Sequence, residues 1–170
     1  LEAAGYRVVA GINGDFYGVS NGVPMGLVVS GGEVKSCSGS YYAVGFTSSG
    51  SAVLGEPKLS MTLRYDYGLT LGSVSALNKV RASYGGIYAY TSEFNDLHTT
   101  GNTEAGVDVI CSVLGGKLSI GGAVSLRVDQ VIEATGATEI PEGKILLSSN
   151  NNASEAQLLR ALVPGQVLTM

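Results

Sequence analysis

Short apolar runs separated by glycine-containing turns recur along the whole chain, and this pattern constrains the fold more than any other feature of the sequence. Two pairs of runs look like hairpins, one around Gly31 and Gly32 and one around the Ser-Ser-Gly turn that ends at Gly50. The stretch 58–67 alternates apolar and polar residues, as a half-buried strand does. Glycine accounts for 25 of the 170 residues, about twice its average share, which suits many tight turns. We therefore expect a β-rich domain rather than a helix bundle.

The remainder of the chain predicts further strands and one clear helix. The strand candidates, which are apolar runs bounded by turn residues, are 6–12, 72–81, 85–91, 106–114, 117–122, 123–135, 144–149 and 166–170. The helix candidate follows Asn152, which can cap it together with Glu155, and it ends at Pro164. The predicted fold class is α+β, a predominantly antiparallel β-sheet with one or two helices in a single domain over 1–170. We also consider the segment from about 65 to 163 as a sub-domain inserted into it.

The charge balance and the apolar pattern exclude several classes of function. Ten basic residues against 14 acidic ones give a net charge of −4, and the basic residues are scattered. A nucleic-acid-binding face needs clustered basic side chains, so we expect no nucleic-acid partner. No apolar run reaches the roughly 18 residues that a membrane span needs, so we expect no transmembrane segment. The two cysteines, Cys37 and Cys111, either form a disulfide or lie apart as buried thiols.

Two polar side chains, Asn13 and Asp15, come directly after the apolar stretch 6–12, where a buried strand would end. Strand ends and the loops after them often carry functional side chains. Asn13 can donate and accept hydrogen bonds, and Asp15 can act as a base, accept hydrogen bonds or coordinate a cation. The alternative is an ordinary Asn-Gly turn that Asp15 closes.

A longer pattern extends from this turn. The first part reads GINGDFY and then NGVPMGLVVSGGEV, and its matching positions are Asn13, Gly14, Phe16, Tyr17, Pro24, Gly26, Leu27, Val28 and Val29. The second part reads LNKVRASYGGIYAYTSEF, and its matching positions are Asn78, Arg81, Tyr90 and Thr91. Together they resemble the phosphodiester glycosidase domain family, in particular its bacterial members. A known reaction of this family removes N-acetylglucosamine from a phosphodiester.

The resemblance implies a carbohydrate-directed hydrolase that cleaves the glycosidic bond of a sugar-1-phosphodiester, so its partner would be a glycan or a sugar phosphate. It implies that Asp15 and Asn13 are catalytic, with Asp15 polarising water or holding sugar hydroxyls and Asn13 bonding a hydroxyl or phosphate oxygen. The implied substrate-binding residues are Gly14, Phe16, Arg81, Tyr90 and Thr91. Arg81 would bind the phosphate, since a guanidinium can donate two hydrogen bonds to it. A surface or strand-end ion pair is the alternative for Arg81.

The family's second signature, an Arg-Thr-Ala segment followed by an Asp-Gly-Gly-Gly-Ser run, does not occur in this sequence. It would begin at about the point where the chain ends, at Met170. We therefore expect a C-terminally truncated domain that holds half of the active-site cleft and is inactive by itself. The resemblance also predicts an extracellular or cell-surface location, because bacterial members of the family are usually exported.

The sequence leaves the cofactor and the alternative function open. The polar stretch 92–105 contains Asp96, Asn102 and Glu104, whose oxygens suit a divalent cation such as calcium, although no EF-hand pattern is present. We predict no certain cofactor and no defined metal site. His98 is the only histidine, and we expect it to be a solvated loop residue. Pairs of neighbouring tyrosines favour the alternative function, a non-catalytic β-rich module that binds glycans or cell wall.

Overall fold

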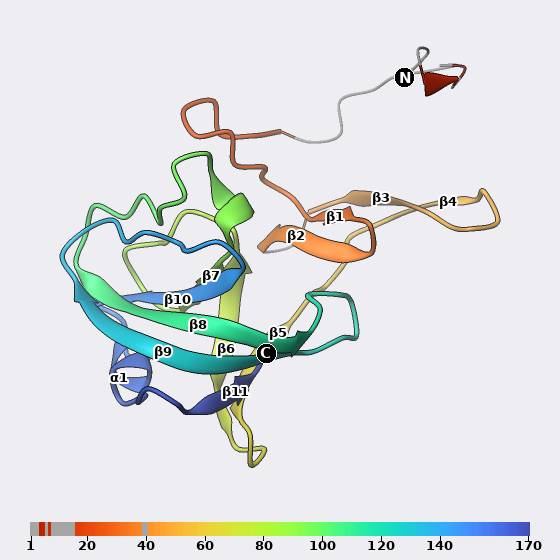
Figure 1. Ribbon diagram of the computed structural model, residues 1–170. Coiled ribbons are helices and arrows are strands. Elements are labelled where there is room, and N and C mark those ends of the chain that lie inside the picture. The colour runs from red at the N-terminus through yellow and green to blue at the C-terminus, as the bar shows by residue number, and fades with distance from the viewer. Residues whose placement is uncertain (1–3, 6, 8–15, 39–40) are drawn as a thin grey trace.

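The strands form one sheet that closes into a barrel. The computed structural model describes residues 4, 5, 7, 16–38 and 41–170. Its strands are β1 (Val28–Ser30), β2 (Glu33–Ser38), β3 (Ala43–Phe46), β4 (Ala52–Gly55), β5 (Met61–Tyr65), β6 (Thr70–Leu77), β7 (Ile87–Tyr90), β8 (Gly106–Gly116), β9 (Val124–Ala134), β10 (Lys144–Asn150) and β11 (Val167–Thr169). Seven of them, in the order β6-β5-β11-β9-β8-β10-β7, close into the barrel because β7 also pairs with β6 (Figure 1).

Neighbouring strands of the barrel are antiparallel except for β6 and β7, which run parallel. The longest hairpin joins β8 to β9, with a register that extends from Gly106 opposite Ala134 to Gly116 opposite Val124. The predicted α+β class with a predominantly antiparallel sheet is therefore confirmed. The closure through one parallel pair was not predicted, because it depends on contacts between distant parts of the chain.

The core fills the barrel with side chains that alternate along its strands. Leu63, Leu77, Val109, Leu126 and Leu168, which come from five different strands, have no solvent exposure. Helix α1 (Glu155–Arg160) adds its own buried side chains, Ala156 and Leu159, to the same core cluster. Each fully buried side chain of this size contributes about 1.5–3 kcal/mol of transfer free energy, so the closed barrel supplies the main stabilisation.

Two hairpins lie outside the barrel wall, and both were predicted. The β1–β2 hairpin turns at Gly31 and Gly32, whose φ values of +59° and +79° favour glycine. It joins the barrel where Cys37 of β2 pairs with Leu77 of β6. The β3–β4 hairpin forms a separate two-stranded sheet that projects away from the barrel (Figure 1).

Two local predictions were wrong. The segment 117–122 is the turn between β8 and β9 rather than a strand, since Gly122 N–H donates to the carbonyl of Ser119 and closes it. The helix begins at Glu155 with Ser154 as its N-cap, so Asn152 does not cap it. The N–H of Asn152 instead donates to the side chain of Asn150, at 2.9 Å.

The predicted strand 6–12 lies outside the described residues apart from Arg7. The polar stretch 92–105 is a connection that contains one short 3-10 helix, η2 (Ser92–Phe94). Strands on both sides of residue 65 pair within one sheet, and an inserted sub-domain over 65–163 stays a prediction. Within the described part of the chain, the structure has no helix long and apolar enough to cross a bilayer.

Cys37 and Cys111 are both buried and free, so the structure favours separate thiols over a disulfide. Burial raises the pKa of each thiol, and it raises that of Cys111 to about 12, because a thiolate would lose its hydration there. Both cysteines therefore act as small apolar core residues at neutral pH.

Candidate functional site

The parallel strands β6 and β7 end at the same end of the barrel, and polar residues follow each of them. Asn78 comes directly after β6, and Thr91 comes directly after β7. The Asn78 Nδ2 donates to the Thr91 Oγ1 at 2.8 Å, and the Thr91 backbone N–H donates to the Asn78 Oδ1 at 2.8 Å. This reciprocal pair fixes the two strand ends against each other.

Asn78 also links this strand end to β2. Its Nδ2 donates to the backbone carbonyl of Lys35 at 2.8 Å, and the backbone carbonyl of Asn78 accepts a hydrogen bond from the Ser36 hydroxyl at 3.2 Å. The backbone of Asn78 has a φ of +51°, which lies in the left-handed region that asparagine tolerates better than most residues. Asn78 is therefore a buried junction of three strands.

We expect Asn78→Ala to lower the free energy of unfolding by about 2–3 kcal/mol, because alanine loses the side-chain hydrogen bonds and strains the left-handed backbone. Asn78→Gly loses the same hydrogen bonds without the strain, so it should be less destabilising. Urea denaturation of both variants measures the two losses. Wild-type stability of Asn78→Ala would show that this junction contributes nothing.

The next residue, Lys79, brings the N-terminal loop to this end of the barrel. Its side chain is buried, and its Nζ donates to the carbonyls of Pro24 and of Gly26, the latter at 2.8 Å. The loop itself is closed by a bridge between Tyr17 and Pro24. The described part of the first pattern, Phe16–Val29, therefore lies against the second pattern, which begins at Asn78.

A pocket of about 360 Å³ adjoins Thr91. Its walls include the basic side chains of Lys35, Lys117 and Lys144 and the acidic side chains of Glu33, Glu93 and Glu142. The Lys35 Nζ lies 2.9 Å from the Glu93 carboxylate and 3.0 Å from that of Glu33, and these two hydrogen bonds raise the pKa of Lys35. The pocket thus presents paired positive and negative groups.

The predicted site residues fall into three groups in the structure. Asn13, Gly14 and Asp15 lie outside the described residues, so their roles stay predictions. Phe16 is 81% exposed at the start of the described loop. Thr91 lines the pocket at the barrel end, whereas Tyr90 and Arg81 are buried and do not line it.

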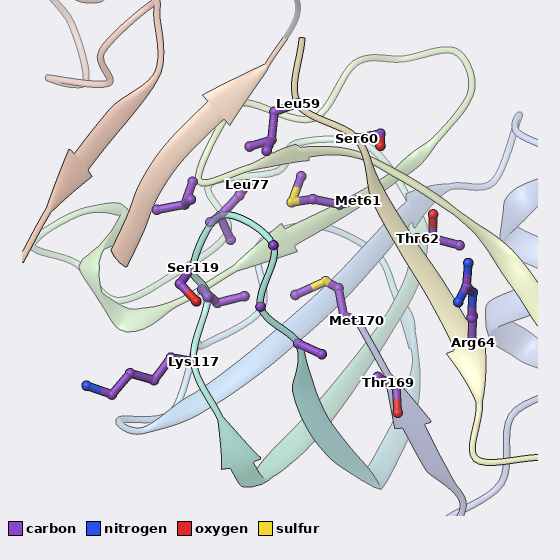
Figure 2. Close-up of a pocket in the computed structure, with 15 residues that line it drawn as sticks. Leu59, Ser60, Met61, Thr62, Arg64, Leu77, Lys117, Ser119, Thr169 and Met170 are labelled. Carbon is purple, nitrogen blue, oxygen red and sulfur yellow. The ribbon is translucent and has the colours of Figure 1, made fainter. Parts of the chain in front are cut away.

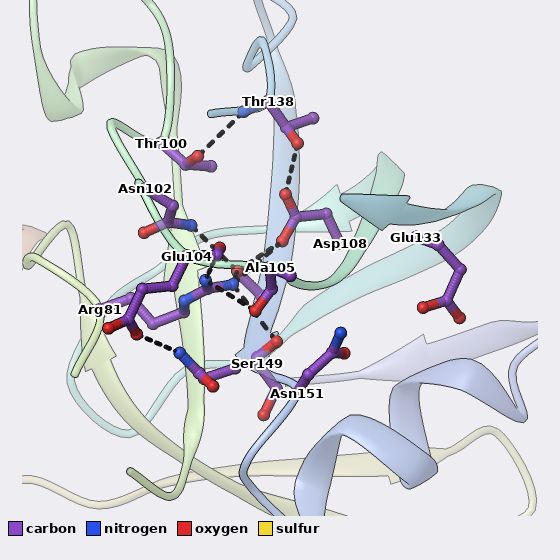
Figure 3. Close-up of polar contacts among 12 residues, drawn as sticks. Arg81, Thr100, Asn102, Glu104, Ala105, Asp108, Glu133, Thr138, Ser149 and Asn151 are labelled. Atoms are coloured by element: carbon purple, nitrogen blue, oxygen red, sulfur yellow. Dashed lines mark hydrogen bonds and ion pairs between the residues drawn. The ribbon is translucent and has the colours of Figure 1, made fainter. Parts of the chain in front are cut away.

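Arg81 belongs to a buried polar network (Figure 3). Its Nη1 donates to the Ser148 hydroxyl at 3.0 Å and lies 3.8 Å from the Asp108 carboxylate, and its Nη2 donates to the carbonyl of Glu104 at 2.6 Å. The side chains of Arg81 and Asp108 are 2% and 0% exposed. The alternatives for Arg81 were phosphate binding and a surface or strand-end ion pair. The structure contains an ion pair with Asp108, and this pair is buried rather than at the surface. Phosphate binding by Arg81 stays a prediction.

Asp108 is the centre of this network. One of its oxygens accepts from the Ser148 hydroxyl and the other from the Thr138 hydroxyl, each at 2.5 Å. Burial raises the pKa of Asp108 above its usual value of 3.8, although both hydroxyls and the Arg81 charge oppose the shift. Sequence reasoning missed Asp108, but a charged residue in the middle of the apolar run 106–114 was the signal for it.

The raised pKa of Asp108 predicts a pH dependence. Between 3.8 and the higher folded-state pKa, the folded protein holds a proton that the unfolded chain releases. The contribution of Asp108 to the free energy of unfolding therefore falls as pH rises through this window. We expect the stability of the wild type relative to Asp108→Asn to decrease as pH rises from about 4 toward neutrality. Urea denaturation of both proteins at several pH values measures this difference. If the stability of the wild type relative to Asp108→Asn rises with pH, the raised pKa of Asp108 is contradicted.

Tyr90 lies in a small second core with Ile140 and Leu146, on which Phe94 packs edge to face at 4.9 Å between ring centroids. Its hydroxyl lies near the Arg81 backbone but makes no hydrogen bond of ordinary geometry with the described residues. Burial raises the pKa of Tyr90 far above its usual value. The ring is fully buried, so it offers no face for a sugar to stack on.

The described residues contain no cluster of three His, Cys, Asp or Glu side chains that could hold a metal ion. In the connection 92–105, the Glu104 carboxylate accepts hydrogen bonds from Ser83 at 3.0 Å and from Asn150 at 2.6 Å. His98 is exposed, and its Nδ1 lies 2.9 Å from the Ser92 carbonyl. The calcium hypothesis for this stretch therefore gains no support from the described residues.

No family model matches the chain, and no curated protein matches it. Among solved structures, it is similar to a crystal structure from Burkholderia pseudomallei K96243 that is described as a "Putative exported protein", with a TM-score of 0.58 and 15% sequence identity. The match covers 85% of this chain but only 32% of that one, so this chain spans about a third of the length of its structural neighbour. At this identity, the similarity shows a shared fold alone.

Proposed function

We propose that this chain is part of a hydrolase that cleaves the glycosidic bond of a sugar-1-phosphodiester, and that the reaction takes place at the barrel end beside Asn78 and Thr91. One observation carries the proposal. The two separated parts of the sequence pattern, Phe16–Val29 and Asn78–Thr91, meet at this end through the contacts of Lys79. Residues that serve one reaction must lie close together, so this convergence supports the resemblance as more than a chance likeness of sequence.

The chemistry that such a substrate needs is modest. A water oxygen forms a bond to the sugar C1 while the bond from C1 to the phosphate oxygen breaks, and the phosphate monoester leaves with the electron pair. A carboxylate takes the proton of the water, and we assign that step to Asp15, which directly precedes Phe16 in the sequence. Lys35 and Lys117 line the pocket and would stabilise the charge on the phosphate.

The similar protein from Burkholderia pseudomallei is described as a "Putative exported protein", and we infer the same destination for this chain. Sugar phosphodiesters occur in glycans of cell surfaces, so an exported hydrolase would meet its substrate there. The location rests on this description and on the sequence resemblance, whereas the hydrolase rests on the sequence resemblance and on the convergence of its two parts.

The proposal is tested by sugar release from an N-acetylglucosamine-1-phosphodiester, with the full-length protein and the 170-residue chain assayed side by side. We expect free N-acetylglucosamine and a phosphate monoester from the full-length protein, and no release from the 170-residue chain, which lacks the second signature. Absence of release by both proteins, across several sugar 1-phosphodiesters, would contradict the proposal.

A second candidate is a module that binds glycans without cleaving them. The observation that favours it is Tyr67, which is 69% exposed in the β5–β6 turn and stacks on Tyr65 with 5.1 Å between ring centroids and 5° between planes. A ring held in this way presents one open face to a sugar. Glycan binding that Tyr67→Ala abolishes, without any hydrolysis, would favour this candidate.

A further inference from the structure

A second pocket, of about 280 Å³, lies between β5, β11 and the turn that joins β8 to β9 (Figure 2). It is a neighbour of the pocket beside Thr91, and the two share Val34, Lys117 and Leu118 as walls. The Val34 backbone N–H donates to the Leu118 carbonyl at 2.6 Å and holds this shared wall together. Of the two lysines assigned to the phosphate in the proposed hydrolysis, Lys117 lines both pockets, whereas Lys35 lines only the pocket beside Thr91.

The interior of this second pocket is apolar. Its apolar lining is formed by Val34, Leu59, Met61, Leu77, Leu118 and Met170. Both Met61 and Met170 belong to this lining (Figure 2). Methionine side chains are unbranched and flexible, so such a wall adapts to apolar chains of different shapes.

The charged residues of the same pocket are both basic. Arg64 and Lys117 line it, and no aspartate or glutamate side chain does, although the whole chain carries a net charge of −4. Arg64 is exposed, and its guanidinium makes no hydrogen bond or ion pair in the part of the chain that the structure describes. Lys117 is 75% exposed, with one distant contact to the Glu33 carboxylate at 3.9 Å.

We propose that this pocket binds a small amphipathic anion, with a short apolar chain against Met61 and Met170 and a carboxylate at Arg64. The apolar interior removes the chain from water, and the excess of positive charge at the mouth complements the anion. Arg64, which would hold the carboxylate, does not line the pocket beside Thr91, so either proposal can fail without the other.

The chain offers a direct readout, because it contains three methionines and two of them line the pocket. The third, Met25, is 48% exposed in the N-terminal loop and serves as an internal control. The protein is labelled with 13C at the methionine methyl groups and titrated with octanoate below its micelle concentration. We expect saturable shifts of the Met61 and Met170 signals while the Met25 signal stays in place.

The role of the charge is tested with a neutral ligand and a matched variant. We expect 1-octanol to bind more weakly than octanoate, and Arg64→Gln to weaken octanoate binding roughly three- to tenfold while it leaves octanol binding unchanged. Lys58→Gln, which removes an exposed charge outside the lining, should change neither affinity. Absence of saturable shifts at Met61 and Met170, equal shifts at Met25, or unchanged octanoate binding by Arg64→Gln would overturn the proposal.

Discussion

Replacing Asp108 by alanine is expected to lower the free energy of unfolding by about 3–5 kcal/mol at neutral pH. The variant leaves the Arg81 guanidinium, 2% exposed, without its carboxylate partner, and it removes the acceptor of the Ser148 and Thr138 hydroxyls. A buried charge without a counter-charge is among the costliest defects that one substitution can create. For a chain of this length, the loss corresponds to a fall in Tm of roughly 6–20 °C.

The matched control is Glu133→Ala, which removes the carboxylate of an exposed ion pair with Arg160. Water solvates both charges of that pair, so its Tm should stay within about a few degrees of the wild type. Thermal denaturation followed by circular dichroism compares the two variants. Equal and small shifts in Tm for both would show that the Arg81–Asp108 network does not stabilise the barrel.

Replacing Asp15 by alanine is expected to lower kcat/KM for sugar release by roughly 10²- to 10⁴-fold in the full-length protein. The reason is the role assigned to its carboxylate, which takes the proton of the attacking water. We expect the Tm of the variant to remain close to that of the wild type, and Asn13→Ala to behave in the same way. Loss of activity with retained stability separates a catalytic role from a structural one.

Asp66→Ala is the control for this prediction, since Asp66 is an exposed carboxylate in the turn after β5, outside the proposed site. It should retain wild-type turnover. Turnover at the wild-type level in both Asp15→Ala and Asn13→Ala would remove the N-terminal loop from the active site.

Local features of the fold could be predicted from the sequence, because they depend on neighbouring residues. The hairpin at Gly31 and Gly32 needs a backbone that glycine adopts easily, and this requirement is visible in the sequence. The prediction of a strand at 117–122 was wrong because its leucine and isoleucine are typical of a strand, while the glycines around them close a turn. Barrel closure through β6 and β7 depends on a parallel pairing between strands, which local patterns do not encode.

The candidate site could be predicted only in part. Asn78 and Thr91 were identified by resemblance, but their reciprocal hydrogen bonds depend on strands that meet only in the folded barrel. Arg81 was given two alternatives, and the deciding partner, Asp108, lies 27 positions further along the chain on β8. Because charge pairing across a barrel leaves no local pattern, such a network becomes visible only in three dimensions.

We propose that the reaction breaks the bond between the sugar C1 and the phosphate oxygen, and hydrolysis in 18O-labelled water tests this proposal most directly. If water attacks C1, the phosphate monoester keeps all of its original oxygens, and its 31P signal shows no isotope shift. If water attacks phosphorus instead, the released phosphate carries one 18O atom and its 31P signal moves. We predict an unlabelled phosphate product; a labelled one would show a phosphodiesterase and contradict the glycosidase assignment.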